Sequence, residues 1–354
     1  MMDLDQYKYF PDLDQENMLG HIDGLPEQLK IAWQTGQQQS LPRWEGIERV
    51  LIAGMGGSAI GADLLNAYVE NQCVVPVVVH RDYNVPAWAR GPQTLVISSS
   101  HSGNTEETLS SFQMARQNGC RCLSITTGGK LAETTRKAGM PLWTFKHDGQ
   151  PRSAVGFSFG LLLALFCRLN LIPNPQDEVV DAVQAMKEQQ QSLQAHVPTI
   201  QNPAKRMAGQ LIGRWVSVFG AGILGPVARR WKGQISELAK AWAQFEFIPE
   251  ADHNTLAGTL NPTELLSKNA ALFLRSPADH PRNRLRLDIT RHMLMLEGIS
   301  TDFLDGKGVT PLGNQWTLLH FGDYTAYYLA MAYEVDPTPV AALVALKEEL
   351  QANP

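Results

Sequence analysis

The sequence predicts an α/β protein made of two doubly wound parallel-sheet domains and a C-terminal helix. Three observations lead to this fold class. The chain has 354 residues, which is too long for one hydrophobic core and suits two domains. Short strand-like runs alternate with helical patterns, as in parallel sheets covered by helices on both faces. The strand-like runs are mostly apolar without polar alternation, as in strands buried on both sides.

The same pattern sets the expected domain boundaries. Residues 1–170 are expected to form an N-terminal extension with the first domain. Residues 171–200 are expected to form a helical linker, and residues 201–354 the second domain with the C-terminal helix. Within the extension, residues 25–33 carry apolar side chains at helical spacing and predict a helix.

The first domain contains five expected strands and four expected helices. The strands are the short apolar runs at residues 49–54, 74–79, 94–98, 120–126 and 142–145. The helices are expected at residues 58–69, 106–117, 131–138 and 154–167. The last of these is the longest apolar run. It is shorter than the about 20 residues that a membrane-spanning helix needs, so it predicts a buried helix.

The second half repeats the alternation. A polar helix rich in glutamine is expected at residues 177–196, between the two domains. The expected strands are residues 215–219, 270–274 and 317–320. The expected helices begin near Leu224 and cover residues 284–297 and 323–333. Residues 336–339, with the sequence Asp-Pro-Thr-Pro, are expected to open a last helix, because proline is tolerated in the first helical turn.

Composition excludes several classes of function. Hydrophobic residues make up 44% and charged residues 18% of the chain, which is typical of a soluble globular protein. The net charge of −5 argues against a nucleic-acid partner. Residues 1–15 lack the basic and apolar regions of a signal peptide, so we expect a cytoplasmic protein without a membrane partner. The cysteines show neither CxxC spacing nor pairing with histidine for a metal: Cys73, Cys120, Cys122 and Cys167.

A glycine-rich loop follows the first expected strand. Residues 54–58, Gly-Met-Gly-Gly-Ser, lie between a strand and a helix, where backbone N–H groups can approach an anion. The spacing does not match the dinucleotide-binding pattern GxGxxG. A tight turn that needs positive φ explains the glycines equally well, so both interpretations stay open.

A loop rich in hydroxyl groups gives the stronger signal. Residues 98–108 follow a strand and open a helix, and Ser100, Ser102 and Thr105 supply three hydroxyls within six residues. The start of the helix adds free N–H donors and a partial positive charge. No lysine follows in the P-loop pattern, so a small phosphomonoester is a better ligand than a nucleotide. The alternative is a helix cap, which does not need so many hydroxyls.

Six segments together resemble a known family. The glycine and hydroxyl segments resemble the sugar isomerase (SIS) domain. Three further segments resemble parts of the bifunctional phosphoglucose/phosphomannose isomerase family. Residues 151–156 resemble the family's arginine segment, residues 229–240 resemble its catalytic-glutamate helix, and residues 252–254 resemble its histidine segment. Asp336-Pro337, with Leu346-Lys347, resembles its C-terminal lysine helix. The resemblance covers about residues 50–350, and the order of the segments makes it specific.

The resemblance implies an aldose–ketose isomerase acting on glucose 6-phosphate and mannose 6-phosphate. Arg152 would stabilise an enediolate, Glu237 would move the proton between C1 and C2, and His253 and Lys347 would assist ring opening. The residues that would bind the phosphate are Gly56, Gly57, Ser58, Ser100, Ser102 and Thr105. The resemblance also implies a homodimer in which His253 comes from the neighbouring subunit. It implies neither a metal nor an organic cofactor.

The residues themselves leave alternatives to this function. Glu237 lies at the edge of an apolar stripe, about 100° from Leu238, and a helical glutamate is commonly a solvated surface residue. The stripe consists of Val227, Trp231, Ile235, Leu238 and Trp242. Thr255 stands where relatives carry a glutamate, which would weaken ring opening if that glutamate orients the histidine. A non-catalytic sugar-phosphate sensor and an isomerase of another sugar phosphate are the alternatives.

Overall fold

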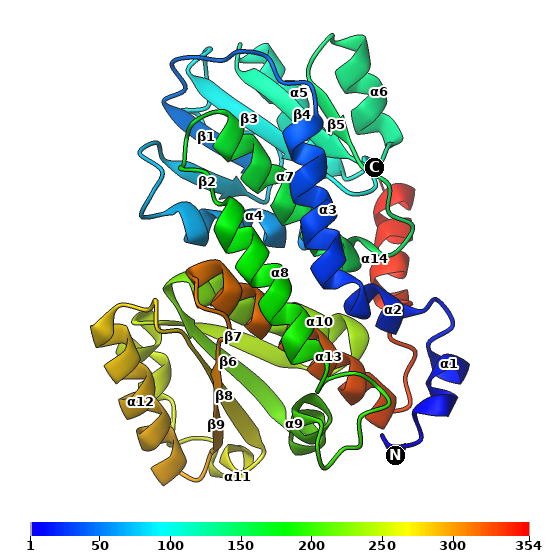
Figure 1. The fold of residues 1–354 in the computed structure, drawn as a ribbon, viewed down its shortest axis with the longest axis vertical. Helices are drawn as coiled ribbons and strands as arrows, with labels where there is room; N and C mark the ends of the chain where they lie inside the picture. Colours follow the sequence, from blue (N-terminus) through cyan, green and yellow to red (C-terminus); the bar gives the residue numbers. More distant parts are fainter. Residues whose placement is uncertain (1, 354) are drawn as a thin grey trace.

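The computed structural model describes residues 2–353 and contains two parallel β-sheets (Figure 1). The first has the strand order β2-β1-β3-β4-β5, and the second β7-β6-β8-β9. Every neighbouring pair of strands is parallel. Helices cover the sheets, so the expectation of two parallel α/β units is confirmed. The domain boundaries near residues 170 and 200 stay a prediction.

The first unit is built on five strands with buried apolar side chains. They are β1 (Arg49–Ala53), β2 (Val77–His80), β3 (Thr94–Ser99), β4 (Arg121–Thr126) and β5 (Leu142–Thr144). Its helices are α3 (Leu25–Gln38), α4 (Gly56–Val69), α5 (Glu106–Gln117), α6 (Gly129–Lys137) and α7 (Val155–Arg168). All six residues of β3 are buried. The chain leaves β1 for the edge strand β2 and then returns to β3, so the strand order reverses between β1 and β3. In such sheets ligands bind at the carboxyl ends of these two strands.

The second unit has four strands. They are β6 (Trp215–Ala221), β7 (Ala243–Ile248), β8 (Asn269–Arg275) and β9 (Ser300–Asp305). Its larger helices are α8 (Gln176–Gln190), α9 (Pro203–Leu211), α10 (Gly225–Leu238), α12 (Pro281–Leu296), α13 (Pro311–Ala332) and α14 (Ala341–Ala352). Three short helices complete the fold: α1 (Phe10–Leu13), α2 (Met18–Asp23) and α11 (Thr263–Leu266).

Three expectations about the second half were wrong. Residues 317–320 are not a strand but belong to α13, whose residues are buried almost throughout, so an apolar run there does not distinguish strand from helix. The last helix begins at Ala341 rather than at residues 336–339, because the carbonyls of residues 336–338 accept hydrogen bonds from Arg152 and Lys240. Trp242 follows the end of α10 and is 71% exposed, so it is not part of the helix stripe.

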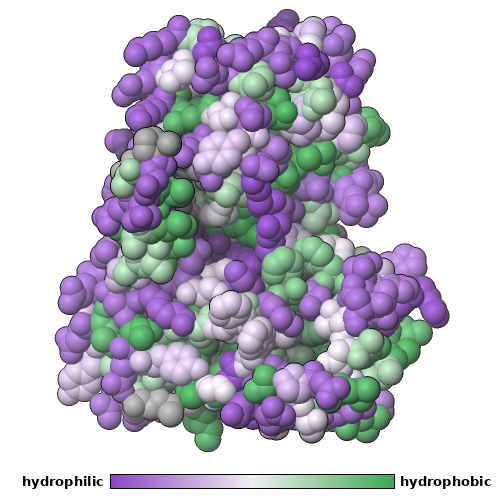
Figure 2. Space-filling view, turned by 180° about the vertical axis from the view of Figure 1, so that it is seen from behind, coloured by the Kyte–Doolittle hydropathy of each residue, from purple (hydrophilic) through white to green (hydrophobic). Residues whose placement is uncertain are grey.

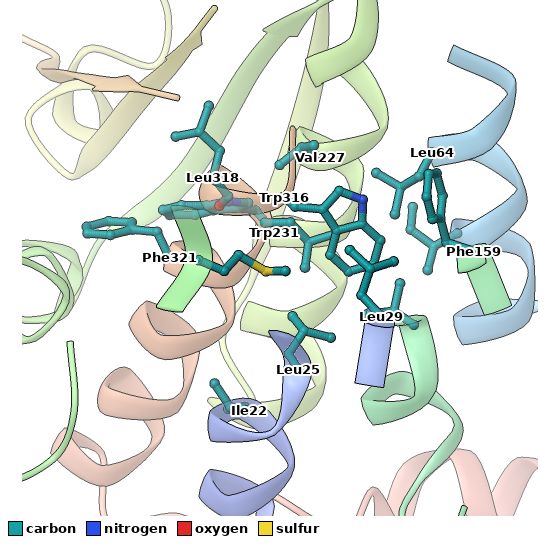
Figure 3. Close-up of a cluster of buried hydrophobic side chains, with 14 of the residues drawn as sticks. Ile22, Leu25, Leu29, Leu64, Phe159, Val227, Trp231, Trp316, Leu318 and Phe321 are labelled. Atoms are coloured by element: carbon teal, nitrogen blue, oxygen red, sulfur yellow. The ribbon is translucent and has the colours of Figure 1, made fainter. Parts of the chain in front are cut away.

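The two units share a hydrophobic core (Figure 3). Phe159 of α7 meets Trp316 of α13 edge to face, with ring centroids 5.1 Å apart. Trp231 of α10 donates a hydrogen bond from Nε1 to the Leu318 carbonyl at 3.0 Å. Leu25 and Leu29 of α3 pack in the same cluster. The two units therefore pack against each other through one continuous core. Among residues 2–353, none of the helices has the length and apolarity to cross a membrane.

Candidate functional site

The glycine loop (residues 54–58) brings two distant segments together at the end of β1. Gly56 has φ +49°, in the left-handed region that favours glycine. A Cβ atom on Gly57 would overlap the carbonyl oxygen of Pro151. This close approach seats the 3₁₀ turn η2 (Pro151–Ala154) against the start of α4. The glycines therefore serve the turn and also place Arg152 beside the loop.

The hydroxyl loop (residues 100–105) lies beside the glycine loop, at the end of β3. Ser58 is 4% exposed, and its Oγ accepts a hydrogen bond from the His101 N–H at 3.1 Å. The Oγ of Ser100 lies 3.0 Å from Oγ1 of Thr105 and accepts from the Gly103 N–H at 3.1 Å. Thr105 occupies the N-cap of α5 without making a capping hydrogen bond. Its hydroxyl instead lies beside the Ser100 hydroxyl, which disfavours the interpretation of Thr105 as a helix cap alone.

Ser102 carries the exposed hydroxyl of the hydroxyl loop. Its Oγ accepts a hydrogen bond from the Asn104 N–H at 3.2 Å, which leaves its own proton free to donate. The expected phosphate-binding hydroxyls Ser58, Ser100, Ser102 and Thr105 are therefore assembled at two neighbouring strand ends. The loop can offer hydroxyl and backbone donors to one anion.

The histidine in the hydroxyl loop adds no positive charge. The ring of His101 contacts His147, with Nε2 and Nδ1 3.0 Å apart. Burial lowers the pKa of His101, and burial together with the neighbouring His101 and His21 lowers the pKa of His147 to about 4. Both rings are neutral at pH 7, so the loop would hold an anion by hydroxyl and amide donors alone.

Arg152 and Glu237 form an ion pair between the two units. Arg152 Nη1 lies 3.5 Å from Glu237 Oε2. Arg152 is 5% exposed, whereas the Glu237 side chain is 33% exposed. Nη2 of Arg152 also donates to the Pro337 carbonyl at 3.0 Å and to the Thr338 carbonyl. These contacts fix the guanidinium, while the carboxylate keeps access to the cleft. A cation held beside a carboxylate can stabilise an oxyanion while the carboxylate moves a proton.

A cleft of about 330 Å³ runs between α4 and α10 and contains this pair. Its lining includes Gly56 and Gly57 of the glycine loop. Five cationic side chains and one carboxylate line it: Arg81, Arg152, Arg229, Arg230, Lys232 and Glu237. Arg152 pairs with Glu237, Arg230 with the buried Asp323, and Arg81 and Arg229 share Asp63, so a smaller excess of positive charge remains, which suits an anionic ligand.

Lys240, the last residue of the segment 229–240, also contacts the elements of the site, although the sequence assigns it no role there. Nζ donates to the carbonyls of Glu237 at 2.8 Å and Leu238 at 3.2 Å, both near the end of α10. It also donates to the Asp336 carbonyl at 2.7 Å. Burial and then the charge of Arg152 lower the pKa of Lys240 to about 8. Lys240 therefore ties the segment that holds Arg152 to the helix that carries Glu237.

The two expected ring-opening residues lie apart from the Arg152–Glu237 pair. His253 is exposed in the 3₁₀ turn η4 (Glu250–His253), which follows β7. Lys347 is exposed on α14. Within residues 2–353, no hydrogen bond or ion pair joins either side chain to another residue. Thr255 is bonded to the neighbouring Asn254, and its effect on ring opening stays a prediction.

The chain is similar to known proteins over most of its length. It is 39% identical over 337 residues to a bifunctional phosphoglucose/phosphomannose isomerase of Caldicellulosiruptor bescii, covering 94% of this chain and 98% of that protein. A protein of the same name from Aquifex aeolicus is 34% identical, over 88% of this chain and 95% of its own length. Residues 200–350 match the model of the bacterial phospho-glucose isomerase C-terminal SIS domain.

A solved structure shows the same fold. The crystal structure of a glucose-6-phosphate isomerase like protein from Thermus thermophilus matches with a TM-score of 0.65 and 18% identity. The match covers 97% of this chain and 100% of that chain. The SIS architecture expected from the glycine and hydroxyl segments is thereby confirmed.

Proposed function

Since the chain belongs to the family of bifunctional phosphoglucose/phosphomannose isomerases, we propose that it interconverts glucose 6-phosphate and mannose 6-phosphate with fructose 6-phosphate. A single site would serve both hexoses. The observation that carries the proposal is the Arg152–Glu237 pair, 3.5 Å apart in a cleft that adjoins the glycine loop. A protein that only senses a sugar phosphate needs a phosphate-binding loop, but it does not need a carboxylate base paired with a cation.

The hydroxyl loop would bind the substrate phosphate. Ser58, Ser100, Ser102 and Thr105 would donate hydrogen bonds to its oxygens, together with backbone N–H groups at the starts of α4 and α5. Helix N-termini favour such anions. Because His101 and His147 are neutral at pH 7, this binding would depend on donors rather than on a local cation.

Glu237 would act as the base and Arg152 as the electrostatic stabiliser. Starting from the open aldose, Glu237 removes the C2 proton, and the electron pair moves to give a C1–C2 enediolate whose charge the guanidinium of Arg152 stabilises. The hydroxyl proton on O2 then moves to O1, and Glu237 returns the abstracted proton to C1, so that the C2–O2 bond becomes the carbonyl of the ketose. In the reverse direction C2 of the planar enediolate can be reprotonated from either face, and this explains how one site would give both glucose and mannose 6-phosphate.

Ring opening would need groups from a second subunit. We propose a cytoplasmic homodimer in which His253 enters the partner's cleft and Lys347 assists it. The proposal is supported by the exposure of His253 and by that of α14, all of whose residues from 341 to 350 are exposed. Hydrophobic side chains of α14 face solvent in the single chain (Figure 2). The reaction would connect hexose phosphates in glycolysis and gluconeogenesis.

The test is an assay of purified protein with fructose 6-phosphate in deuterated water. Glucose 6-phosphate and mannose 6-phosphate are measured separately by coupled enzymes, and deuterium at C2 of each product is measured by NMR. Formation of both products with deuterium at C2 supports the proposal. If fructose 6-phosphate does not react but another sugar phosphate does, the protein is an isomerase of that other substrate. Binding of fructose 6-phosphate without product or exchange would indicate a sensor.

A further inference from the structure

The outer end of the cleft carries positive charge that the isomerase chemistry does not use. Arg81 donates to the Asp63 carboxylate and to the Ala59 carbonyl, the latter at 3.1 Å. Arg229 Nη1 lies 3.2 Å from the same Asp63 carboxylate. Lys232 lines the cleft and, within residues 2–353, makes neither a hydrogen bond nor an ion pair. One carboxylate is thus shared by two arginines and Lys232 has no partner among these described residues, which leaves two positive charges in surplus.

This cluster is separated from the catalytic pair along α10. Arg229 precedes Glu237 by eight residues, or about 12 Å of helix. Asp63 lies about two turns into α4, whose first residue, Gly56, borders the Arg152 end of the cleft. Lys232 precedes Glu237 by five residues, or about 7.5 Å of helix, so both cations lie more than one helical turn from the Glu237 position.

The strand order places the cluster on the far side of the glycine loop from the hydroxyl loop. Arg81 directly follows β2, the glycine loop follows β1, and the hydroxyl loop follows β3, and the sheet order is β2-β1-β3. The ends of β2 and β3 are thus two strand spacings apart, or about 10 Å. Two positions suited to anions therefore flank the glycine loop at one edge of the sheet.

We propose that Arg81, Arg229 and Lys232 form a second phosphate-binding site, which accepts the far phosphate of a hexose bisphosphate. The inference rests on the proposed role of the hydroxyl loop, which would hold the first phosphate. The two arginines offer planar N–H donors and Lys232 a free ammonium, a combination suited to a phosphate dianion. A monophosphate leaves this site empty, whereas a bisphosphate spans the cleft and excludes substrate.

Glucose 1,6-bisphosphate is the probe, because its phosphorylated C1 keeps the ring closed and makes it an inhibitor rather than a substrate. Its inhibition constant is measured against fructose 6-phosphate for the wild type and for Lys232→Met. Loss of one charge-assisted contact should raise that constant about tenfold. KM for fructose 6-phosphate should rise less than the inhibition constant, because the single phosphate of that substrate would be held by the hydroxyl loop.

Lys268→Met is the matched control, since Lys268 is exposed at the opposite end of the second sheet, just before β8. It makes the same change in net charge and should leave the inhibition constant unchanged. An equal rise in both variants would show only a long-range charge effect and would overturn the proposal. So would an unchanged constant in Lys232→Met, or a tenfold rise in KM for fructose 6-phosphate.

The proposed activity and the second site can fail separately. A wild type that turns over fructose 6-phosphate but is not inhibited by the bisphosphate keeps the isomerase and overturns the second site. If the wild type shows no turnover, the binding of glucose 1,6-bisphosphate is measured directly by titration calorimetry. Binding that weakens about tenfold in Lys232→Met but not in Lys268→Met supports the site, and absence of binding overturns it.

Discussion

Arg152 is held mainly by residues more than 80 positions away in the sequence. Its guanidinium contacts Glu237 and the carbonyls of Pro337 and Thr338, and its own carbonyl accepts a hydrogen bond from Arg230 at 3.1 Å. With 5% exposure it has little freedom to move. A fixed cation does not have to reorganise as negative charge develops on the substrate, and such preorganisation is commonly the largest contribution to catalysis.

Glu237→Gln should abolish turnover while preserving binding. Glutamine keeps the shape of the side chain and can still bond to Arg152, but it cannot accept the proton. A general base contributes about 10²–10⁴-fold, and kcat should fall by at least the upper value because Glu237 carries the proton alone. Exchange of the C2 proton with solvent should stop, whereas the affinity for fructose 6-phosphate should change little.

Glu297→Gln provides the control for that substitution, because Glu297 is an exposed glutamate just after α12, outside the cleft. It should behave as wild type. A Glu237→Gln enzyme that keeps kcat within a few-fold of wild type would identify a different base.

Ser102→Ala and Thr105→Ala should weaken substrate binding. Each removes one hydroxyl that would donate to the phosphate dianion, and a hydrogen bond to a charged group contributes about 1.5–3 kcal/mol. KM for fructose 6-phosphate should rise about tenfold or more. Ser267→Ala removes an exposed hydroxyl next to α11 and should leave KM unchanged. An unchanged KM in both loop variants would rule out this loop as the phosphate site.

At the scale of elements, Lys240 joins the end of α10 to the segment between α13 and α14. That segment holds Arg152 through the carbonyls of Pro337 and Thr338, and Lys240 holds it through the carbonyl of Asp336. A change in Lys240 should therefore displace the Arg152–Glu237 pair, through the Glu237 backbone and through the segment that holds Arg152.

The protonation of Lys240 should appear in the pH dependence of kcat. Its pKa is lowered to about 8 in the folded protein, so kcat should fall as pH rises through about 8 and the ammonium loses a donor. Lys240→Arg stays protonated and should remove this alkaline limb. Lys240→Met should lower kcat about tenfold at every pH, since small displacements in a site are costly. If the fall in kcat above about pH 8 persists in Lys240→Met, a group other than Lys240 causes it.

The stability of the fold should change in the opposite direction over that pH range. Because the pKa of Lys240 lies below its usual 10.5, the unfolded chain binds more protons than the folded one between about pH 8 and 10.5. The contribution of Lys240 to the free energy of unfolding therefore rises with pH there. The free energy of unfolding, measured by chemical denaturation at pH 7 and 9, reports this effect separately from the loss of activity.

The sequence predicts the first unit better than the second. The strands β1 to β5 are short apolar runs between turn signals, and each was expected within a few residues of its observed position. Strands β7 and β9 were missed because they are the edges of the second sheet, half-buried and carrying Glu246 and Asp302 among their residues. Helix α13 was split into a strand and a helix because it is buried on all sides and has no polar face to reveal its period.

The site likewise combines features that a local stretch of sequence predicts with features that depend on contacts between distant segments. The hydroxyl loop was recognisable because its hydroxyls are clustered in the sequence, and in the fold those of Ser100 and Thr105 are hydrogen-bonded to each other. The role of Lys240 and the cluster of Arg81, Arg229 and Lys232 depend on contacts between segments far apart in the chain. No local spacing encodes those contacts. The places of His253 and Lys347 in a completed site stay predictions.

At the scale of the whole molecule, one chain does not bring the four proposed catalytic residues together. Arg152 and Glu237 meet within it, whereas His253 and Lys347 are exposed. Helix α14 also exposes Val344, Leu346 and Leu350 by 55%, 55% and 56%. Exposed apolar side chains along one helix are typical of a surface that is covered in an assembly, as a second subunit would do here.

A homodimer with His253 lent across the interface predicts complementation between inactive variants. Glu237→Gln and His253→Ala proteins, each inactive alone, are refolded together in equal amounts. Half of the dimers should then be mixed, and each mixed dimer has one site with both an intact Glu237 and the partner's intact histidine. About a quarter of the wild-type activity should return, measured by the coupled assay alongside light scattering to follow the dimer.

Arg152→Ala mixed with Glu237→Gln is the matched control for complementation. These two residues form an ion pair inside one chain, so every site in a mixed dimer lacks one of them and no activity should return. Recovery in the first mixture and not in the second would show that His253, unlike Arg152, serves the neighbouring chain. If neither mixture recovers although mass spectrometry shows exchanged subunits, each site is completed by its own chain. His253 would then have to reach the cleft by a movement of η4 toward α10.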